Sequence, residues 1–326
     1  MTRHVILGKG PIGTTLAHHL ADAGHEVLVV SRSGAGASSR PDEEPDAIRH
    51  TSLDASDAAA LTRAAQGADV LYNCVNPPYH RWPTDWPPIA SALLSAAEST
   101  GAVLVTTGNL YGYGAGTQLM LENSLLASTE SKGAVRAAMW REVERRHRAG
   151  RVRATEVRGS DYLGPRALGN AHAGSRMLGP VVAGKTLRPI GSADVLHTWT
   201  YLPDFARALA AAGTTEAAWG AAWHVPSPEP LTFRQLATRF ADAAGAPTPR
   251  IRPLPNGVLR ALGLASPMLR EIVAMDYERT EPFVMDSTAS QRVLRFAPTS
   301  WDVVVAETLD WWRNRSLDVP SSQQPA

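Results

Sequence analysis

The sequence predicts an α/β fold in which a doubly wound parallel sheet is joined to a smaller, discontinuous C-terminal substrate domain. Two observations predict the sheet, and the smaller domain is implied by motifs farther along the chain. Short apolar runs typical of buried strands alternate with helical patterns along the N-terminal third of the chain, and a glycine-rich turn follows the first of these runs. Alternation of this kind implies right-handed crossovers and therefore parallel strands.

The first strand, the first helix and the second strand surround the glycine-rich turn. HVILG is short and apolar, a helix is expected from Pro11 to Gly24, and HEVLVVSRS has the pattern of the next strand. In G-x-G-x-x-G, glycine lets the backbone approach a pyrophosphate, whose charge the free amides at the helix start would bind. The context predicts a Rossmann-like dinucleotide site. Its expected contacts in the turn are Gly8, Gly10, Pro11, Ile12 and Gly13.

The end of the second strand indicates which dinucleotide is bound. A carboxylate here would hydrogen-bond the adenosine ribose of NAD(H), but the sequence has Ser31, Arg32 and Ser33. A guanidinium flanked by hydroxyls suits a ribose phosphate, so NADP(H) is preferred over NAD(H). The competing interpretation is that Arg32 is a solvated loop charge, because the stretch that follows has the composition of a mobile loop.

Polar residues follow the later strands of the predicted sheet. These strands are expected at residues 48–54, 68–75 and 102–108. In such sheets the ligand lies beyond the carboxyl ends of the strands. Asp54, Asn76 and the run TTGNLYGYG (106–114) stand at those ends. Asp54 and Asn76 therefore join the expected cofactor contacts.

Composition and charge limit the kinds of partner. The 326 residues are 44% hydrophobic and 19% charged, as in a globular protein, and the formal net charge of +1 gives no general attraction to nucleic acid or to an anionic membrane. A small-molecule substrate is the expected partner. The single cysteine, Cys74, excludes an intrachain disulfide and is expected to be buried filler. Without a membrane-spanning run, a signal peptide or a metal-ligand spacing, we expect a cytoplasmic protein that holds no metal.

Three motifs follow one another in a recognisable order: TTGNLYG at the end of a strand, SK at the start of a helix, and RGSDYLGP (158–165). With HTWTYLPDFARAL (197–209), they make the chain similar to the extended short-chain dehydrogenases/reductases, of the NAD-dependent epimerase/dehydratase type. We therefore expect a nucleotide-binding domain and a substrate-binding cap, followed by a disordered tail. The expected bounds are 1–165 and 190–225 for the nucleotide domain, 166–189 and 226–315 for the cap, and 316–326 for the tail.

The resemblance implies a catalytic set with one departure. In that family a serine or threonine holds the substrate oxygen, a tyrosine exchanges its proton, and a lysine four residues later binds the nicotinamide ribose and lowers the pKa of the tyrosine. Thr107 and Lys132 match these places, and Tyr111 lies near Thr107 in the chain. Ser128 stands at the tyrosine position, on what we expect to be the same helix face as Lys132. Because an aliphatic hydroxyl is a far weaker acid than a phenol, Ser128 is a poor proton donor.

The chain thus resembles the atypical branch of the family, and three interpretations of its function stay open. The first is an NADP-dependent oxidoreductase acting on a small carbonyl or hydroxyl compound, or on a natural-product-like substrate. Its proton would come from Tyr79, Tyr111, Tyr113, Tyr162 or His197, and the ammonium of a nearby Lys132 would favour an ionised tyrosine. The second is a non-redox isomerase, dehydratase or cyclase using the same cleft. The third is a non-catalytic NADP-binding regulator, against which the retention of Thr107 and Lys132 argues.

The expected substrate contacts disfavour a diphosphate sugar. Where many relatives use an asparagine and an arginine around substrate phosphates, this sequence has Asp161 and His197. The structural alternatives for these two are a turn cap and an interdomain hydrogen bond. Trp82 and Trp86 are expected in a loop, either walling an apolar pocket or packing on their own domain. The expected substrate-binding set is Tyr79, Trp82, Asn109, Tyr113, Asp161, Tyr162 and His197.

Residues 131–148 have a helical pattern. Val135, Ala138, Met139 and Val143 fall on one side, where we expect them to face inward, with Arg and Glu outside. Because the corresponding helix joins subunits in relatives, the resemblance also allows a homodimer.

Overall fold

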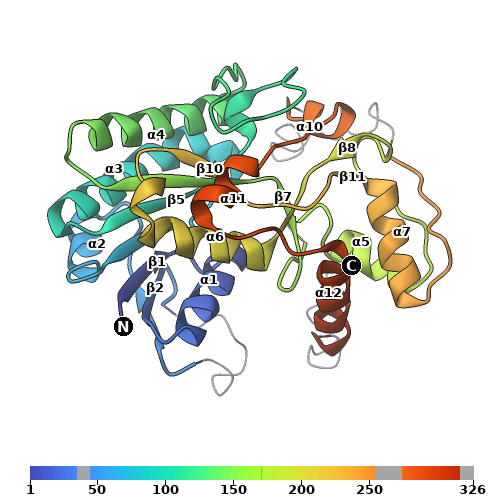
Figure 1. Cartoon of the computed structure of the whole chain (residues 1–326), viewed down its shortest axis with the longest axis horizontal. Helices are drawn as coiled ribbons and strands as arrows, with labels where there is room; N and C mark the ends of the chain where they lie inside the picture. The colour runs from blue at the N-terminus through green and yellow to red at the C-terminus, as the bar shows by residue number, and fades with distance from the viewer. Residues whose placement is uncertain (35–44, 170, 255–273, 316–326) are drawn as a thin grey trace.

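A computed structural model describes residues 1–34, 45–169, 171–254 and 274–315 (Figure 1). At its centre is a seven-stranded sheet with the order β10-β6-β5-β4-β1-β2-β3, in which every neighbouring pair is parallel. The strands are β1 (Arg3–Leu7), β2 (Glu26–Ser31), β3 (Ile48–Ser52), β4 (Val70–Asn73), β5 (Val103–Asn109), β6 (Ala154–Gly159) and β10 (Ala222–His224). The doubly wound parallel sheet expected from the sequence is therefore confirmed. The predicted strands at 48–54 and 68–75 contain β3 and β4, and β5 extends one residue beyond the predicted strand at 102–108.

Helices cover both faces of the sheet. Figure 1 shows α1 (Pro11–Asp22) and α6 (Leu202–Thr214) below it, and α3 (Trp82–Thr100) and α4 (Ser131–Arg148) above it. Leu16 and Leu209 belong to the hydrophobic cluster of the first face, and Leu93 and Trp140 to that of the second, which also takes in Leu61 from α2 (Ala58–Ala64). None of the helices in the described ranges is both long enough and apolar enough to cross a bilayer.

The loop expected around Trp82 and Trp86 is the beginning of a helix. Helix α3 starts at Trp82, with Pro83 in its first turn, where the missing N–H of proline costs no hydrogen bond. Both indoles are completely buried, and Nε1 of Trp82 donates to the carbonyl oxygen of Pro77 over 2.8 Å. The expectation of a loop is wrong because Trp82 and Trp86 lie in the first two turns of α3, which also accommodates Pro87 and Pro88.

Helix α4 has the predicted bounds but buries a different stripe. Its buried positions include Arg136, Ala137 and Trp140, whereas Ala138 is exposed and Met139 is only half-buried. The predicted inward face is therefore rotated by about one residue, and Val143 belongs to both stripes. The rotation arises because the guanidinium of Arg136 packs on the indole rings of Trp82 and Trp86 in α3, where cation–π contacts stabilise its charge.

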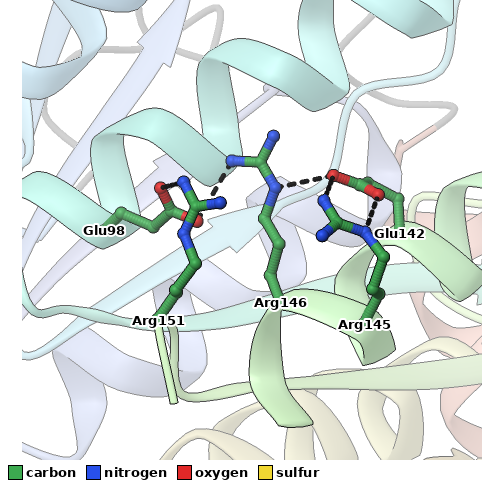
Figure 2. Close-up of polar contacts among 5 residues, drawn as sticks. All are labelled: Glu98, Glu142, Arg145, Arg146 and Arg151. Carbon is green, nitrogen blue, oxygen red and sulfur yellow. Dashed lines mark hydrogen bonds and ion pairs between the residues drawn. The ribbon is translucent and has the colours of Figure 1, made fainter. Parts of the chain in front are cut away.

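Charged residues join the outer edges of α3 and α4 (Figure 2). Glu98 accepts hydrogen bonds from Arg146 over 3.1 Å and from Arg151 over 2.8 Å. Arg146 also donates to Glu142, which binds Arg145 as well, and these two arginines lower the pKa of Glu142 to about 2. The network ties the two helices together where α4 ends. Arg145 and Glu142 lie outward as expected, whereas Arg136 of the same helix is buried against that expectation.

A second, smaller hydrophobic core is formed by helices and strands from the C-terminal half of the chain. It gathers Leu178 from α5 (Ser175–Val182), Phe240 from α7 (Phe233–Ala244) and Leu309 from α12 (Trp301–Arg315), helices that lie together at the right of Figure 1. Short strands complete this region: β7 (Asp161–Leu163) pairs with β9 (Trp199–Tyr201), and β8 (Leu196–His197) with β11 (Leu231–Thr232). Two further helices are α10 (Tyr277–Thr280) and α11 (Thr288–Leu294). The expected tail, 316–326, lies outside the described residues.

Candidate functional site

A cavity of about 1310 Å³ opens at the carboxyl ends of the central strands. Between β1 and β4 the strand order reverses, which is where open α/β sheets bind their ligands. The wall runs from the glycine-rich turn, past the ends of β2, β4 and β5, to segments of the C-terminal region. The expected site residues on this wall are Gly8, Gly10, Pro11, Ile12, Ser31, Arg32, Ser33, Asp54, Asn76, Tyr79, Thr107, Asn109, Tyr111, Asp161 and Tyr162. The other expected residues, all of them within the described ranges, lie off it: Gly13, Trp82, Tyr113, Ser128, Lys132 and His197.

The glycine-rich turn is packed tightly on one side and open on the other. Gly8 has a φ of +110°, and a Cβ atom there would lie 2.6 Å from the carbonyl oxygen of Cys74. A Cβ atom on Gly13 would lie 2.0 Å from the carbonyl oxygen of Gly8, whereas one on Gly10 would meet nothing within 4 Å. Gly10 caps α1, and Pro11 follows it. The turn therefore leaves a cradle with helix amides at its base, and this fits a dinucleotide pyrophosphate.

The outer end of the cavity carries Arg32 and Asp54. Ser31 Oγ accepts a hydrogen bond from the Gly34 amide over 3.2 Å, and the hydroxyl of Ser52 donates to the carbonyl oxygen of Arg32 over 2.7 Å, which fixes the backbone after β2. The amide and hydroxyl of Ser56 lower the pKa of Asp54, and the nearby charge of Arg32 lowers it further. An ionised carboxylate and a guanidinium thus stand together at this end of the cavity.

The inner end of the cavity brings Thr107 and two phenols together. The hydroxyls of Tyr79 and Tyr111 are 3.2 Å apart, and Thr107 Oγ1 lies 3.5 Å from Sγ of Cys74. Burial raises the pKa of the Cys74 thiol to about 12, so this cysteine is a poor thiolate. It is half-buried and lines the cavity, which differs from the buried filler that the sequence predicted.

Arg136 places a positive charge on this part of the wall, and the sequence patterns did not single it out. Its guanidinium donates to the carbonyl oxygen of Thr107 over 3.1 Å and lies over the rings of Trp82 and Trp86, 4.7 and 4.6 Å from their centroids. Burial lowers the pKa of Arg136, and arginine side chains keep their charge at neutral pH in proteins. The available signal was the spacing of KGAVR, in which a second cation follows Lys132 by one helical turn.

Ser128 and Lys132 do not share a helix face. The side chain of Glu130 caps α4 by accepting from the amides of Lys132 and Gly133 over 2.9 and 3.2 Å, so the helix begins at Ser131 and Ser128 precedes it. The hydroxyl of Ser128 is buried without a partner in the described part of the chain, where a Cβ atom on Gly133 would lie only 2.1 Å from it. The ammonium of Lys132 lies 2.9 Å from Glu130, and its side chain is 1% exposed.

Tyr113 belongs to a buried polar network behind the cavity. Its hydroxyl lies 2.7 Å from Nε2 of His224 and accepts from Arg158 over 2.8 Å. Arg158 in turn lies 2.6 Å from Glu156 on the same strand, with both side chains almost fully enclosed. These contacts occupy Tyr113 and turn its hydroxyl to the far side of β5, away from Thr107.

The tyrosines near the cavity are held neutral. Burial raises the pKa of Tyr79 and Tyr111, the charge of Glu278 raises both further, and burial raises the pKa of Tyr162 to about 12. The expectation that Lys132 would favour an ionised tyrosine is therefore wrong for these residues, because its ammonium is directed to Glu130 and burial dominates.

The pKa values of two carboxyl groups on the cavity wall are shifted in opposite directions. Burial alone would raise the pKa of Asp161, but contact with His197, whose Nε2 lies 3.3 Å from Oδ2, and the charge of Arg279 hold it below its ordinary value. Burial raises the pKa of Glu278 to about 8, while Arg279 opposes the shift. His172 also lines the cavity, and burial lowers its pKa to about 3, so it is neutral at physiological pH.

Several wall residues come from segments that carry no recognisable motif in the sequence. Arg176 and Arg188 are exposed cations at the mouth of the cavity, and Glu278 and Arg279 lie deeper. They are distant in sequence from the nucleotide-binding motifs, and charged residues on a helix or loop usually indicate only a solvated surface. Within the described ranges, no three histidine, cysteine or acidic side chains gather closely enough to hold a metal ion.

The seven-stranded parallel sheet, the glycine-rich turn and the cavity at the switch point define a doubly wound α/β protein of the Rossmann class. Residues 5–222 match the profile of the NAD dependent epimerase/dehydratase family, which is about two thirds of the chain. The chain belongs to that family, as the motifs in its sequence indicated.

Solved structures show the same fold over nearly the whole chain. UDP-glucose 4-epimerase from Thermotoga maritima, with UDP-glucose, has a TM-score of 0.77 at 14% identity, covering 96% of this chain and 99% of that one. UDP-glucuronic acid 4-epimerase from Bacillus cereus, in complex with NAD, gives 0.76 at 15%, with 96% and 99% covered. An epimerase from Methanothermobacter thermautotrophicus gives 0.79 at 17%, with 97% and 93% covered. At these identities the likeness establishes the fold alone, and no curated protein matches the chain.

Proposed function

We propose that the protein is an NADP(H)-dependent oxidoreductase of the atypical extended short-chain type, acting on a small carbonyl or hydroxyl compound. The observation that carries the proposal is the continuity of the cavity: one space joins the open side of Gly10 to Thr107 and Tyr111. When bound, the dinucleotide supplies or accepts a hydride at the inner end. The chain's own residues bind the pyrophosphate at the glycine-rich turn and orient the substrate oxygen.

Within this proposal the inner residues have distinct roles. Thr107 and Tyr111 hold the substrate oxygen through their hydroxyls, which burial keeps protonated in the case of Tyr111. Arg136 places a fixed positive charge beside them, where it stabilises negative charge on an oxygen. Lys132 acts from behind the wall, through its charge. Ser128 has no direct role, since its hydroxyl is turned against Gly133.

The preference for NADP(H) rests on Arg32. The guanidinium stands on the wall at the end of β2, between two serines, where an acidic residue would repel a phosphate. Two considerations compete with it: the ionised carboxylate of Asp54 stands beside Arg32 at this end of the cavity, and the Bacillus cereus neighbour was solved with NAD.

Fluorescence titration of the pure protein with NADPH and with NADH tests the cofactor preference. We expect NADPH to bind more tightly than NADH. In Arg32→Ala the ratio of the two dissociation constants should fall by about tenfold or more, because the variant loses a charge-assisted contact to the phosphate. Arg49→Ala, an exposed arginine on the neighbouring strand β3 and off the cavity wall, is the matched control. Tighter binding of NADH by the wild type would exclude the proposed role of Arg32.

The substrate proposal favours a small anionic carbonyl compound. Arg176 and Arg188 at the mouth would attract a carboxylate or phosphate, while Phe233 and Phe283 on the wall would pack against apolar atoms. Pyruvate and benzaldehyde, incubated with NADPH, distinguish an anionic from a neutral carbonyl substrate by the rate of NADPH oxidation. Homodimer formation is a separate part of the proposal, and light scattering of the pure protein tests it.

A second candidate is a non-redox epimerase or isomerase that uses the same cavity, and membership of the epimerase/dehydratase family favours it. Two of the solved neighbours are epimerases of uridine diphosphate sugars. Incubation with UDP-glucose and with NADP⁺ or NAD⁺ separates the candidates. Formation of an epimer with no net change in the nicotinamide would support the second candidate and contradict the first.

A further inference from the structure

At the inner end of the cavity, where Thr107 lies, none of the residues expected to exchange a proton with the substrate is suited to that role. The hydroxyl at Ser128 faces away from the cavity, and the three tyrosines on the wall have pKa values raised by burial, so none of them exchanges a proton readily near neutral pH. His197 lies off the wall, close to Asp161. A proton donor, if the cavity has one, must come from another part of the chain.

Glu278 has the geometry of such a donor. Its side chain is 1% exposed and lies on the cavity wall with Tyr79 and Tyr111. Its Oε1 atom is enclosed and has no hydrogen-bond partner in the described ranges, and Oε2 is 3.4 Å from Arg279, longer than a good charge-assisted hydrogen bond. A buried carboxyl oxygen without a partner, on the wall of a cavity, is positioned to meet a ligand.

The groups around Glu278 come from five parts of the fold. Arg279 is adjacent on α10, Asp161 is on β7, and Lys132 with Glu130 lies at the start of α4. Tyr79 and Tyr111 face it from the short 3₁₀ turns Tyr79–Arg81 and Tyr111–Tyr113, since the charge of Glu278 raises the pKa of both phenols. The positive charges of Arg279 and Lys132 are shared with Asp161 and Glu130, so neither is committed to Glu278.

We infer that Glu278 is the proton donor and acceptor of this cavity and takes the place of the tyrosine that is absent at Ser128. The inference rests on the proposed oxidoreductase function. In the direction of reduction, the carbonyl carbon gains the hydride that bound NADPH would supply, leaving NADP⁺, and the carbonyl oxygen gains the proton of Glu278. C=O thereby becomes CH–OH, and in the reverse direction the hydride would pass to NADP⁺. The carboxylate that remains regains a proton from water in the cavity. In the direction of oxidation, Glu278 begins as the carboxylate and accepts the hydroxyl proton.

The two carboxyl groups on the cavity wall, Glu278 and Asp161, then have different roles. A catalytic acid is most effective when its pKa lies near the working pH, and burial brings Glu278 to about 8. Asp161 remains ionised, since His197 and Arg279 favour its charged form. Pairs of carboxyl groups whose surroundings push their pKa values apart are typical of acid–base sites.

Infrared difference titration of the full-length protein tests the state of Glu278 without substrate or cofactor. We expect the carbonyl stretch of a protonated carboxyl that persists at about pH 7 and disappears toward about pH 9 in the wild type. It should be absent from Glu278→Gln and present in the matched control Glu281→Gln, an exposed residue off the cavity wall. A wild-type spectrum without this band, or a band unchanged in Glu278→Gln, overturns the inference.

Turnover provides the second measurement. With NADPH and pyruvate or benzaldehyde, Glu278→Gln should lower kcat by about 100-fold or more, while the dissociation constant for NADPH changes by less than about threefold. Glu278→Asp should recover part of the rate, because a shorter carboxyl can still exchange the proton. Full activity of Glu278→Gln refutes the inference, whereas failure of the wild type to bind NADPH contradicts the proposed function and leaves the infrared result standing.

Discussion

Gly10 and Gly13 are three residues apart in one turn, but an added methyl group would meet different surroundings at each. At Gly13 it would lie 2.0 Å from the backbone oxygen of Gly8, which cannot move without disturbing β1. At Gly10 it would meet nothing within 4 Å and would project toward the cavity. One glycine therefore serves the fold and the other serves the ligand.

Alanine substitutions should separate these two roles. Gly13→Ala should lower the free energy of unfolding by about 2 kcal/mol or more through overpacking. Gly10→Ala should stay within about 1 kcal/mol of the wild type but bind NADPH at least about tenfold more weakly, because the methyl group occupies the place of a pyrophosphate. Urea denaturation and fluorescence titration measure the two effects. Equal loss of stability in both variants would contradict the assignment.

Arg136 is the clearest case of a site residue that the sequence did not reveal. The glycine-rich turn could be predicted because its residues are contiguous and each has a local geometric requirement. Arg136 gains its position from Trp82 and Trp86, some fifty residues earlier in the chain, and from the carbonyl oxygen of Thr107. Lys132 precedes Arg136 by one helical turn and lies off the cavity wall. This position depends on where α4 begins, which is fixed by the cap at Glu130.

Replacement of Arg136 by methionine should remove its charge while filling the slot between the indoles. We expect Arg136→Met to fold, since methionine packs well against aromatic rings, and to lower kcat for NADPH-dependent carbonyl reduction by about tenfold or more, because the charge that stabilises the developing negative oxygen is lost. Arg141→Met is the control, because Arg141 is exposed on the same helix and donates to the carbonyl oxygen of Leu126. Unchanged kcat in Arg136→Met would show that its guanidinium serves only packing.

At the scale of single elements, α4 shows how a cap decides which residues share a face. Two residues four apart meet on a helix only if both are helical. Glu130 satisfies the first amides of α4 and binds the ammonium of Lys132, so the helix starts after Ser128. The sequence predicted the bounds of α4 correctly, but its inward face depends on α3, which supplies the rings beneath Arg136.

Removal of the cap should destabilise the chain more than an ordinary surface change. Glu130→Ala loses two hydrogen bonds to amides and leaves the buried ammonium of Lys132 without its 2.9 Å ion pair, so the free energy of unfolding should fall by about 3 kcal/mol. Glu144→Ala, which breaks an exposed pair with Arg148 on the same helix, should cost less than about 1 kcal/mol. Guanidinium denaturation of both variants measures the difference. Similar losses would mean that Glu130 is a surface acid.

At the scale of the whole molecule, the cavity combines a predictable half with an unpredictable one. The half built from β1, β2, β4 and β5 follows from strand order, since parallel strands present their carboxyl ends at one edge. The half that carries Glu278 and Arg279 comes from a segment about 150 residues beyond α4's start, with no motif of its own. Its position follows from the packing of the C-terminal region, which local patterns do not encode.

The burial of Glu278 should also be visible in the stability of the whole chain. Its ordinary pKa is 4.5 and the folded value is about 8, so the folded state holds a proton that the unfolded chain releases. Below about pH 4.5 both states are protonated and the contribution of Glu278 to stability is fully present. As the pH rises toward about 8, the unfolded chain ionises first and that stability is lost, at up to about 1.4 kcal/mol for each pH unit.

Glu278→Gln, which cannot ionise, should therefore escape this loss. Its Tm should match that of the wild type near pH 4.5 and exceed it increasingly up to about pH 8. Above that pH the difference in Tm should stay constant. Each kcal/mol of difference in the free energy of unfolding corresponds to roughly 2 to 4 °C in Tm. Buried histidines such as His172 and His224 affect both proteins equally, so they cancel in the difference. Calorimetry of the two proteins across this range provides the comparison. A difference in Tm that stays flat with pH would mean that Glu278 is already ionised in the fold.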